Sequence, residues 1–247
     1  MRYLLFVALP FLFCLAGTGK QMQPVSSIIC REEGFINKAI TYSRSGDVLS
    51  FVQTGDSAAY EYAGDSIIVT RYFSEDSSKV LQVYHTDGFG RIRTEQVYDT
   101  QLKPLSRSKF VYSADGFLSG VEAVNQRTGA TFRFLFTYAE GDLITMEVML
   151  NEELLRTFHY TYDANRKNML ALSQEVPGYP VFSAEDAHSP FGKTSTHLLK
   201  EKVIVEANQD TTGHEVYINK TDADGRLVSQ VMKDMRYGTL LHLEYMY

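Results

Sequence analysis

The sequence predicts an all-β protein: an antiparallel meander of about twelve to fourteen strands that forms a barrel-like or strongly curved sheet. Three observations predict it. Hydrophobic and polar residues alternate with a period of two, short turn signals separate the alternating runs, and the turns recur at a nearly constant step. After residue 19 no stretch has the spacing of an amphipathic helix, and only a short stretch such as 151–155 could form a helical turn.

The clearest alternation covers residues 130–138. One face carries four aromatic side chains, Phe132, Phe134, Phe136 and Tyr138. The other face carries Thr131, Arg133 and Thr137. Residues 155–162 and 241–247 alternate in the same way. Aromatic and β-branched side chains favour a pleated surface that is covered on one face, so these segments are predicted strands.

Turn signals rich in Gly and Asp separate the predicted strands. Gly adopts positive φ angles without strain and Asp bonds to its own backbone, as tight hairpins require. The signals lie at residues 44–47, 64–65, 87–90, 114–116, 127–129, 140–142 and 222–225.

The turns belong to a repeat: a Tyr, two or three spacers, a Gly, and then an apolar pair or near-pair. It covers residues 42–49, 62–68, 112–118 and 138–144, with variants at 84–92, 162–165 and 221–227. The steps from Gly90 to Gly116, Gly141 and Asn165 are 26, 25 and 24 residues, and Asn165 is expected to replace Gly because Asn also tolerates the left-handed conformation. One step corresponds to one hairpin, so repeats must pair with their neighbours.

The units at residues 112–118 and 221–227 resemble the YD-type repeats of bacterial surface proteins. Over residues 35–247 the chain resembles an uncharacterised family of secreted Bacteroidetes proteins whose single domain is a porin-like antiparallel β meander. The resemblance implies a fold and an export route, and it supplies no catalytic residues.

Residues 1–19 are predicted to be a signal peptide. Arg2 provides the positive region, residues 4–16 are apolar, and small residues follow. Cleavage after Ala16 and an uncleaved N-terminal anchor are the alternatives. We expect an N-terminal extension over 20–34 and a single β domain over 35–247. The protein is therefore expected to be exported, to the periplasm, the cell surface or the medium.

Residues 168–197 interrupt the repeat and contain three of the six Pro. Loops this long are usually functional or cover a core, so a cap over one end of the sheet and a binding loop are both open. The candidate binding residues in this loop are Tyr179, Asp186, His188, Phe191 and Lys193.

The formal net charge of -6 argues against a broad nucleic-acid footprint. The His residues lack zinc-site spacing and no Cys pair exists, so neither a metal nor another cofactor is expected. Asp222-Ala-Asp-Gly225 resembles the middle of a calcium loop, but Lys220 and Val231 stand where Asp and Glu are required. The expected function is a non-catalytic binding or structural role in the cell envelope. No partner is identified; an envelope protein or a glycan is the expected class.

Two alternatives remain open. An outer-membrane β-barrel is favoured by the aromatic final strand, 241–247, but Lys109, Glu147 and Glu206 place charge on candidate outer faces. Membrane insertion is expected only under this alternative. A hydrolase would use the 168–197 loop, which contains Asp186 and His188 together with Ser173, Ser183 and Ser189 but no Gly-x-Ser-x-Gly motif.

Overall fold

The computed structural model describes residues 27–32, 35–42, 48–53, 56–73, 78–168 and 191–246. This part of the chain contains sixteen strands and no helix long and apolar enough to cross a membrane. The strands are β1 (Ser27–Glu32), β2 (Phe35–Tyr42), β3 (Val48–Gln53), β4 (Asp56–Ala63), β5 (Ser66–Phe73), β6 (Lys79–Thr86), β7 (Ile92–Tyr98), β8 (Pro104–Tyr112), β9 (Leu118–Asn125), β10 (Thr131–Ala139), β11 (Asp142–Leu150), β12 (Glu153–Lys167), β13 (His197–Glu206), β14 (Thr211–Thr221), β15 (Leu227–Asp234) and β16 (Leu240–Met246).

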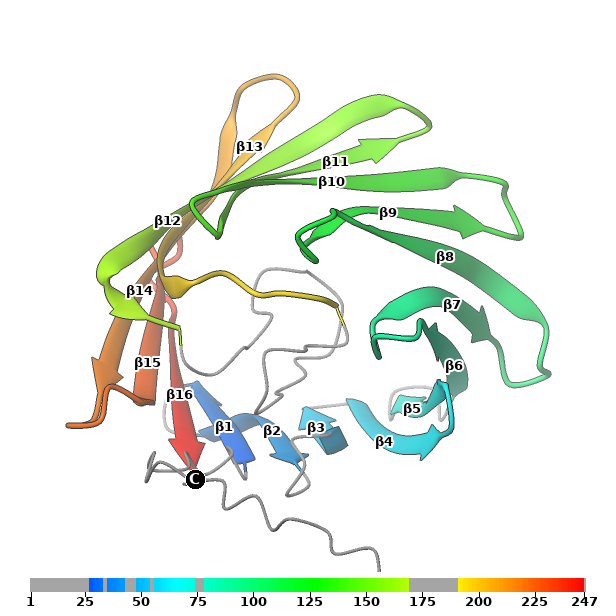
Figure 1. Cartoon of the computed structure of the whole chain (residues 1–247), viewed down its shortest axis with the longest axis horizontal. Helices are drawn as coiled ribbons and strands as arrows, with labels where there is room; N and C mark the ends of the chain where they lie inside the picture. The colour runs from blue at the N-terminus through cyan, green and yellow to red at the C-terminus, as the bar shows by residue number, and fades with distance from the viewer. Residues whose placement is uncertain are drawn as a thin grey trace, which may run out of the picture.

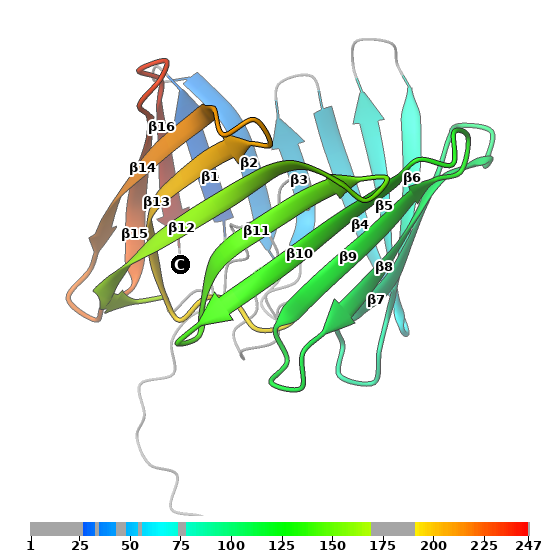
Figure 2. The same ribbon diagram turned by 90° about the horizontal axis from the view of Figure 1, so that it is seen from above.

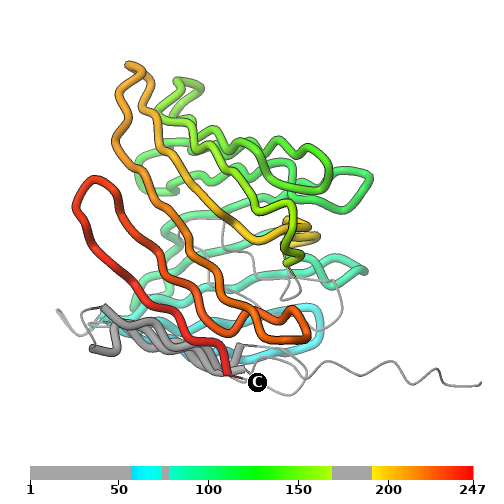
Figure 3. The backbone as a smooth tube through the Cα atoms, turned by 90° about the vertical axis from the view of Figure 1, so that its left-hand side faces the viewer, coloured from blue at the N-terminus to red at the C-terminus, as the bar shows by residue number. Residues whose placement is uncertain are grey.

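Each strand pairs antiparallel with the next one along the chain, and β1 pairs with β16 to close a barrel (Figure 1). Figure 3 shows β12 to β16 as one continuous tilted wall. The predicted all-β antiparallel meander is confirmed. The described strands outnumber the expected twelve to fourteen, and β1 lies inside residues 20–34, which were predicted to form an extension. The sheet therefore begins before residue 35. The predicted signal peptide, 1–19, lies outside the described residues.

The turns fall on two rims of the barrel. The repeat rim carries the turns at 64–65, 87–91, 113–117, 140–141 and 222–226, and it lies at the lower end in Figure 2. The opposite rim carries the described turns at 99–103, 126–129, 151–152, 207–209 and 235–238. The repeats share one rim because each step spans two strands, so the chain returns to the same end of the barrel after every repeat.

Asp side chains fix two of the repeat-rim turns. Asp87 Oδ1 accepts hydrogen bonds from the backbone N–H groups of Phe89 and Arg91 at 2.9 and 3.0 Å, and its Oδ2 accepts from the Arg91 guanidinium at 2.7 and 2.9 Å. Asp222 and Arg226 repeat this arrangement. The segment that resembles a calcium loop is thus a hairpin turn whose carboxylate is bonded to its own turn.

Consecutive repeats contact each other beside the turn glycine. Arg91 directly follows one such glycine, and its guanidinium lies 4.5 Å from the ring centroid of Tyr112 in the next repeat. Phe117, in the same position one repeat later, has its ring centroid 4.6 Å from that of Tyr138. Tyr112 also donates a hydrogen bond to the carbonyl of Ile92 at 2.7 Å. The repeat tyrosines therefore bind neighbouring hairpins together.

Two local predictions were wrong. Asn165 does not form a left-handed turn, because β12 continues to Lys167 and the backbone N–H of Asn165 donates to the Asp163 carboxylate at 3.1 Å. Residues 151–155 form no helical turn. Asn151 and Glu152 have φ angles of 49° and 70°, and these two residues make a tight turn between β11 and β12.

The hydrophobic core lies on the inner faces of the strands. Directly opposed residues share a face, so the buried pairs Ile67–Tyr84 and Met146–Phe158 show which side of each strand is inner. The largest fully buried apolar side chains are Tyr84, Ile92, Leu118, Leu143, Met146 and Val69.

Charged residues lie in the middle of the outer faces. Lys109 shares the outer face of β8 with Val111, which is half exposed. Glu147 is exposed on β11, but Leu143 does not share its face: a register shift opposite Ile144 turns Leu143 into the core.

Glu206 does not lie on an outer face, contrary to the prediction. Ile204 opposes Phe158 and packs against the core, so Glu206, two residues later, lies on the inner face as well. Its carboxylate lies 3.5 Å from the Arg156 guanidinium.

Candidate functional site

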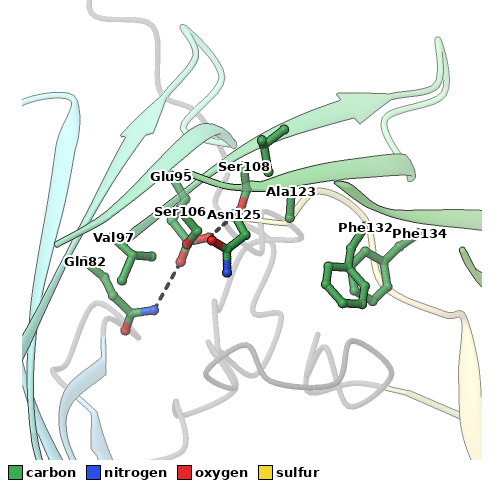
Figure 4. Close-up of a pocket in the computed structure, with 10 residues that line it drawn as sticks. Gln82, Glu95, Val97, Ser106, Ser108, Ala123, Asn125, Phe132 and Phe134 are labelled. Carbon is green, nitrogen blue, oxygen red and sulfur yellow. Dashed lines mark hydrogen bonds between the residues drawn. The ribbon is translucent and has the colours of Figure 1, made fainter. Parts of the chain in front are cut away.

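A cavity of about 440 Å³ lies on the inner side of β6 to β10 (Figure 4). Its volume falls in the range of about 300–1,000 Å³ that is common for small-molecule sites. The lining residues are Gln82, Glu95, Val97, Ser106, Ser108, Ala123, Val124, Asn125, Phe132 and Phe134.

Small side chains form the floor of the cavity. Ser108 lies directly opposite Ala123, and Ser106 lies opposite Asn125, in the antiparallel pair β8–β9. The inner faces of β8 and β9 therefore carry mostly small side chains at these two successive cross-strand pairs. Larger side chains on β6, β7 and β10 lie on either side of these two pairs, which explains why a space remains at this point of the barrel wall.

Glu95 on β7 forms the polar wall, and it is only 5% exposed. One carboxylate oxygen accepts a hydrogen bond from Gln82 Nε2 at 3.1 Å, and the other accepts from Ser108 Oγ at 2.8 Å. Burial raises the pKa of the Glu95 carboxyl, against the opposing interactions with Ser108, Tyr84 and Gln82. The protein therefore favours the protonated form of Glu95 more than water does.

Phe132 and Phe134 form the aromatic wall, and both rings project from the same side of β10 (Figure 4). Phe134 opposes Val121 and Val148 and packs against the core. Phe132 opposes Ala123 and keeps 36% of its surface exposed although it lies on the inner face. The Phe132 ring is thus accessible from the cavity, on the side across from Glu95.

Residues 191–197, which we call the strap, run across the repeat rim to β13. Phe191 is buried, and its ring centroid lies 5.8 Å from that of Phe110, the next inner-face residue of β8 after Ser108. The backbone N–H of Lys193 donates to the Gly116 carbonyl at 2.9 Å, and its ammonium lies 5.5 Å from the Phe117 ring centroid. The strap therefore packs on the barrel beside the cavity.

Ser195, His197 and Asp142 are the residue types of a hydrolytic triad, but their hydrogen bonds are those of an anchor. The Ser195 hydroxyl, 1% exposed, accepts from the backbone N–H of Leu143 at 3.1 Å and donates to the Tyr162 hydroxyl at 3.0 Å. The Asp142 carboxylate bonds to both the backbone N–H and the ring Nδ1 of His197. These contacts join the strap to β11 and β12.

A second polar network lies on the inner faces of β13 to β15. The Lys202 ammonium lies 2.6 Å from the Glu215 carboxylate, which also accepts a hydrogen bond from the Tyr217 hydroxyl. Burial, followed by the charge of Glu215, raises the pKa of Tyr217. Gln230 donates to Asn219 at 2.7 Å. The first three groups are bonded to one another, the last two form a separate pair, and both sets stabilise the wall.

The structure places two of the predicted loop residues. Phe191 is a core residue and Lys193 bonds to the β8–β9 turn, whereas Tyr179, Asp186 and His188 lie outside the described residues. The serines of the hydrolase alternative, Ser173, Ser183 and Ser189, also lie outside them. The cavity residues were missed at the sequence level. Their only signal was a carboxylate at Glu95 within an alternating strand.

No protein-family model and no curated protein matches the sequence. Solved structures do match the fold. A porin-like protein from Bacteroides uniformis superposes with a TM-score of 0.60 at 13% identity, covering 90% of this chain and 96% of that one. A porin-like protein from Bacteroides vulgatus also gives 0.60 at 13% identity, covering 91% and 98%. This chain is similar to both in its antiparallel β-meander fold, which is what a likeness at such low identity shows.

Proposed function

We propose that this protein is an exported, non-catalytic binding protein of the bacterial cell envelope that holds a small molecule inside its barrel. The observation that carries the proposal is the cavity between β6 and β10, where a small-residue floor separates an aromatic wall from a polar wall. Concave sites with apolar walls and a few convergent polar groups are the usual form of a ligand site.

The charges on the outer face support a barrel that is surrounded by water. Arg133 forms an ion pair with Glu122 at 3.0 Å on neighbouring strands, and His214 lies 2.6 Å from Glu201 on another pair. An Arg or Lys side chain on the lipid face of a membrane barrel costs about 2–4 kcal/mol near the bilayer midplane, and Asp or Glu costs less. This cost disfavours the outer-membrane alternative.

The hydrogen bonds of the candidate catalytic groups support a binding role. Each carboxylate oxygen of Glu95 already accepts a hydrogen bond, and the hydroxyl of Ser195 is buried with two partners. A general base or nucleophile needs access to a substrate atom. The buried Ser195 hydroxyl lacks that access, and the Glu95 carboxylate is held by Gln82 and Ser108 as part of the cavity wall.

The binding proposal is tested with two matched variants of residues 20–247. Ala123→Phe fills the floor of the cavity, and Val111→Phe adds the same ring on the outer face of the adjacent strand. A small-molecule library screened by thermal shift is expected to yield ligands that stabilise the wild type and Val111→Phe but not Ala123→Phe. Ligands that stabilise all three proteins equally, or a library without any hit, would contradict the proposal.

The aqueous setting is tested separately. Residues 20–247 are expected to refold and remain monodisperse in buffer without detergent, as measured by size-exclusion chromatography with light scattering. Recovery only in detergent would favour the outer-membrane alternative.

A further inference from the structure

We infer that the cavity between β6 and β10 takes a neutral saccharide: a hydroxyl-rich molecule that lays an apolar ring face on Phe132 and Phe134. This inference rests on the proposed function, because it names the class of ligand for the same cavity.

The aromatic wall suits the ring face of a sugar. Phe132 retains 36% exposure although it lies on the inner face. An aromatic ring carries negative charge on its face, so it attracts the positively polarised C–H groups that line one face of a sugar ring. Phe134 extends this surface along the same strand, so that a ring placed on Phe132 contacts both.

The floor and the polar wall together offer hydrogen-bond donors and acceptors. Asn125 Oδ1 accepts from the backbone N–H groups of Arg127 and Thr128, which directs its Nδ2 donor into the cavity (Figure 4). Gln82 donates its Nε2 to Glu95, so its Oε1 is the acceptor that remains for a ligand. The Ser106 hydroxyl can serve in either role. Sugar hydroxyl groups both donate and accept, and therefore match this mixed set.

The charges disfavour an ionic ligand. Within the described part of the chain, neither Lys nor Arg lines the cavity, so an anion would find no partner in this lining. Glu95 is the only ionisable residue among the described lining residues, and Gln82 and Ser108 already bond to its two oxygens. Burial of this carboxyl raises its pKa, so the wall favours the uncharged acid and offers a cation no fixed partner.

The polar groups of the floor and the polar wall also disfavour a purely apolar ligand such as a fatty acyl chain. Such a ligand would remove water from Gln82, Ser106 and Asn125 without replacing its hydrogen bonds. Each polar group left without a partner in this way weakens binding, because its lost hydrogen bond to water is not replaced. An uncharged ligand that is apolar on one side and hydroxylated on the other avoids this cost.

The test is calorimetric titration of residues 20–247 with cellobiose, maltose and N,N′-diacetylchitobiose, and with laurate and spermidine as apolar and cationic comparisons. At least one saccharide is expected to bind, and laurate and spermidine are expected not to. Phe132→Leu should weaken saccharide binding about tenfold, because it keeps an apolar side chain but removes the ring. Leu135→Ala, an outer-face change on the same strand, should leave the affinity unchanged.

The outcomes separate the two proposals. Binding of laurate or spermidine that is lost in Ala123→Phe, without saccharide binding, overturns the saccharide inference and retains the cavity as a ligand site. Saccharide binding that is unchanged in both Phe132→Leu and Ala123→Phe places the sugar elsewhere and overturns both. If none of the saccharides binds while the library screen yields cavity ligands of another class, only the inference of a saccharide fails.

Discussion

Asp142, the first residue of β11, binds His197, the first residue of β13, across 55 positions of sequence. One carboxylate oxygen accepts the backbone N–H of His197 at 2.9 Å and the other contacts its ring Nδ1 at 2.7 Å. Both residues lie on the repeat rim, where the strap joins the barrel wall. The pair therefore ties the end of the β12–β13 connection to β11, a strand that is not adjacent to this connection in sequence.

Asp142→Ala is expected to lower the free energy of unfolding by about 1–3 kcal/mol, because it removes two hydrogen bonds and leaves the His197 N–H without its acceptor. Urea denaturation measures the loss, and hydrogen exchange should show faster exchange of the Thr196 and His197 amides. Asp115→Ala, on the exposed part of the neighbouring turn, is the control and should change stability by less than about 0.5 kcal/mol. Equal effects of the two substitutions would show that the Asp142–His197 pair does not secure the strap.

Gly192→Ala is expected to destabilise the protein by more than about 3 kcal/mol. Gly192 has a φ angle of 84°, and a Cβ atom there would lie 2.5 Å from the Gly116 carbonyl oxygen and 2.9 Å from the Tyr112 ring. Gly64 provides the matched control, since its φ angle is 63° but a Cβ atom would meet nothing within 4 Å. Gly64→Ala should therefore cost only the backbone strain, about 1 kcal/mol. Similar melting temperatures for the two variants would contradict the close packing of the strap on the β8–β9 turn.

Glu95→Gln is expected to stabilise the protein at neutral pH and to flatten its pH dependence. Burial raises the pKa of Glu95, so the folded protein holds this proton more tightly than the unfolded chain. The stabilising contribution of the protonated group is complete below the unfolded pKa and is lost as the pH rises through the folded pKa. Each tenfold difference in proton affinity between the folded and unfolded chains corresponds to about 1.4 kcal/mol of stability.

Urea unfolding of wild type and Glu95→Gln between pH 4 and pH 8 measures this difference, with Glu122→Gln on the outer face as the control. The curves of wild type and Glu95→Gln should separate with rising pH. Parallel curves would show that Glu95 keeps an ordinary pKa in the folded protein.

The turn carboxylates Asp87 and Asp222 are expected to titrate below their ordinary value. Burial works in the opposite direction, but hydrogen bonds from Arg91 and the backbone lower the pKa of Asp87, and those from Arg226 and Asp224 lower the pKa of Asp222. Their stabilising effect is therefore present above the unfolded pKa and lost as the pH falls through the lower folded pKa. Carboxyl carbon NMR should show both groups still ionised at a pH where exposed carboxyls are half protonated. Arg91→Met should raise the midpoint of Asp87 and leave that of Asp222 unchanged.

The repeat made much of the fold predictable. Alternation assigned strands such as β10, and the turn signals bounded most of the hairpins, because both depend on residues that are adjacent in sequence. The predicted left-handed turn at Asn165 is absent for two reasons. The Asp163 side chain accepts a hydrogen bond from the Asn165 backbone, and the long connection that follows β12 needs no tight turn. β1 was missed because its partner, β16, is at the other end of the chain.

The cavity could not be predicted in the same way. It depends on which side chains stand opposite each other across five strands, such as Ser108 opposite Ala123 and Glu95 opposite Ser108. Register shifts occur in both the β7–β8 and β8–β9 pairs, and one shift moves a side chain to the other face. Sequence reasoning favoured the long loop instead, because its proline content is visible without knowledge of register.

The placement of the described Tyr-Gly turns on one rim has a consequence for how such a barrel can change size. A single repeat contains two antiparallel strands, so inserting or deleting one repeat changes the circumference of the barrel by two strands. Every remaining turn keeps its own rim, and every remaining side chain keeps its own side of the wall. A sheet assembled from these units can widen or narrow its lumen in discrete steps while the rules that fold each hairpin stay the same.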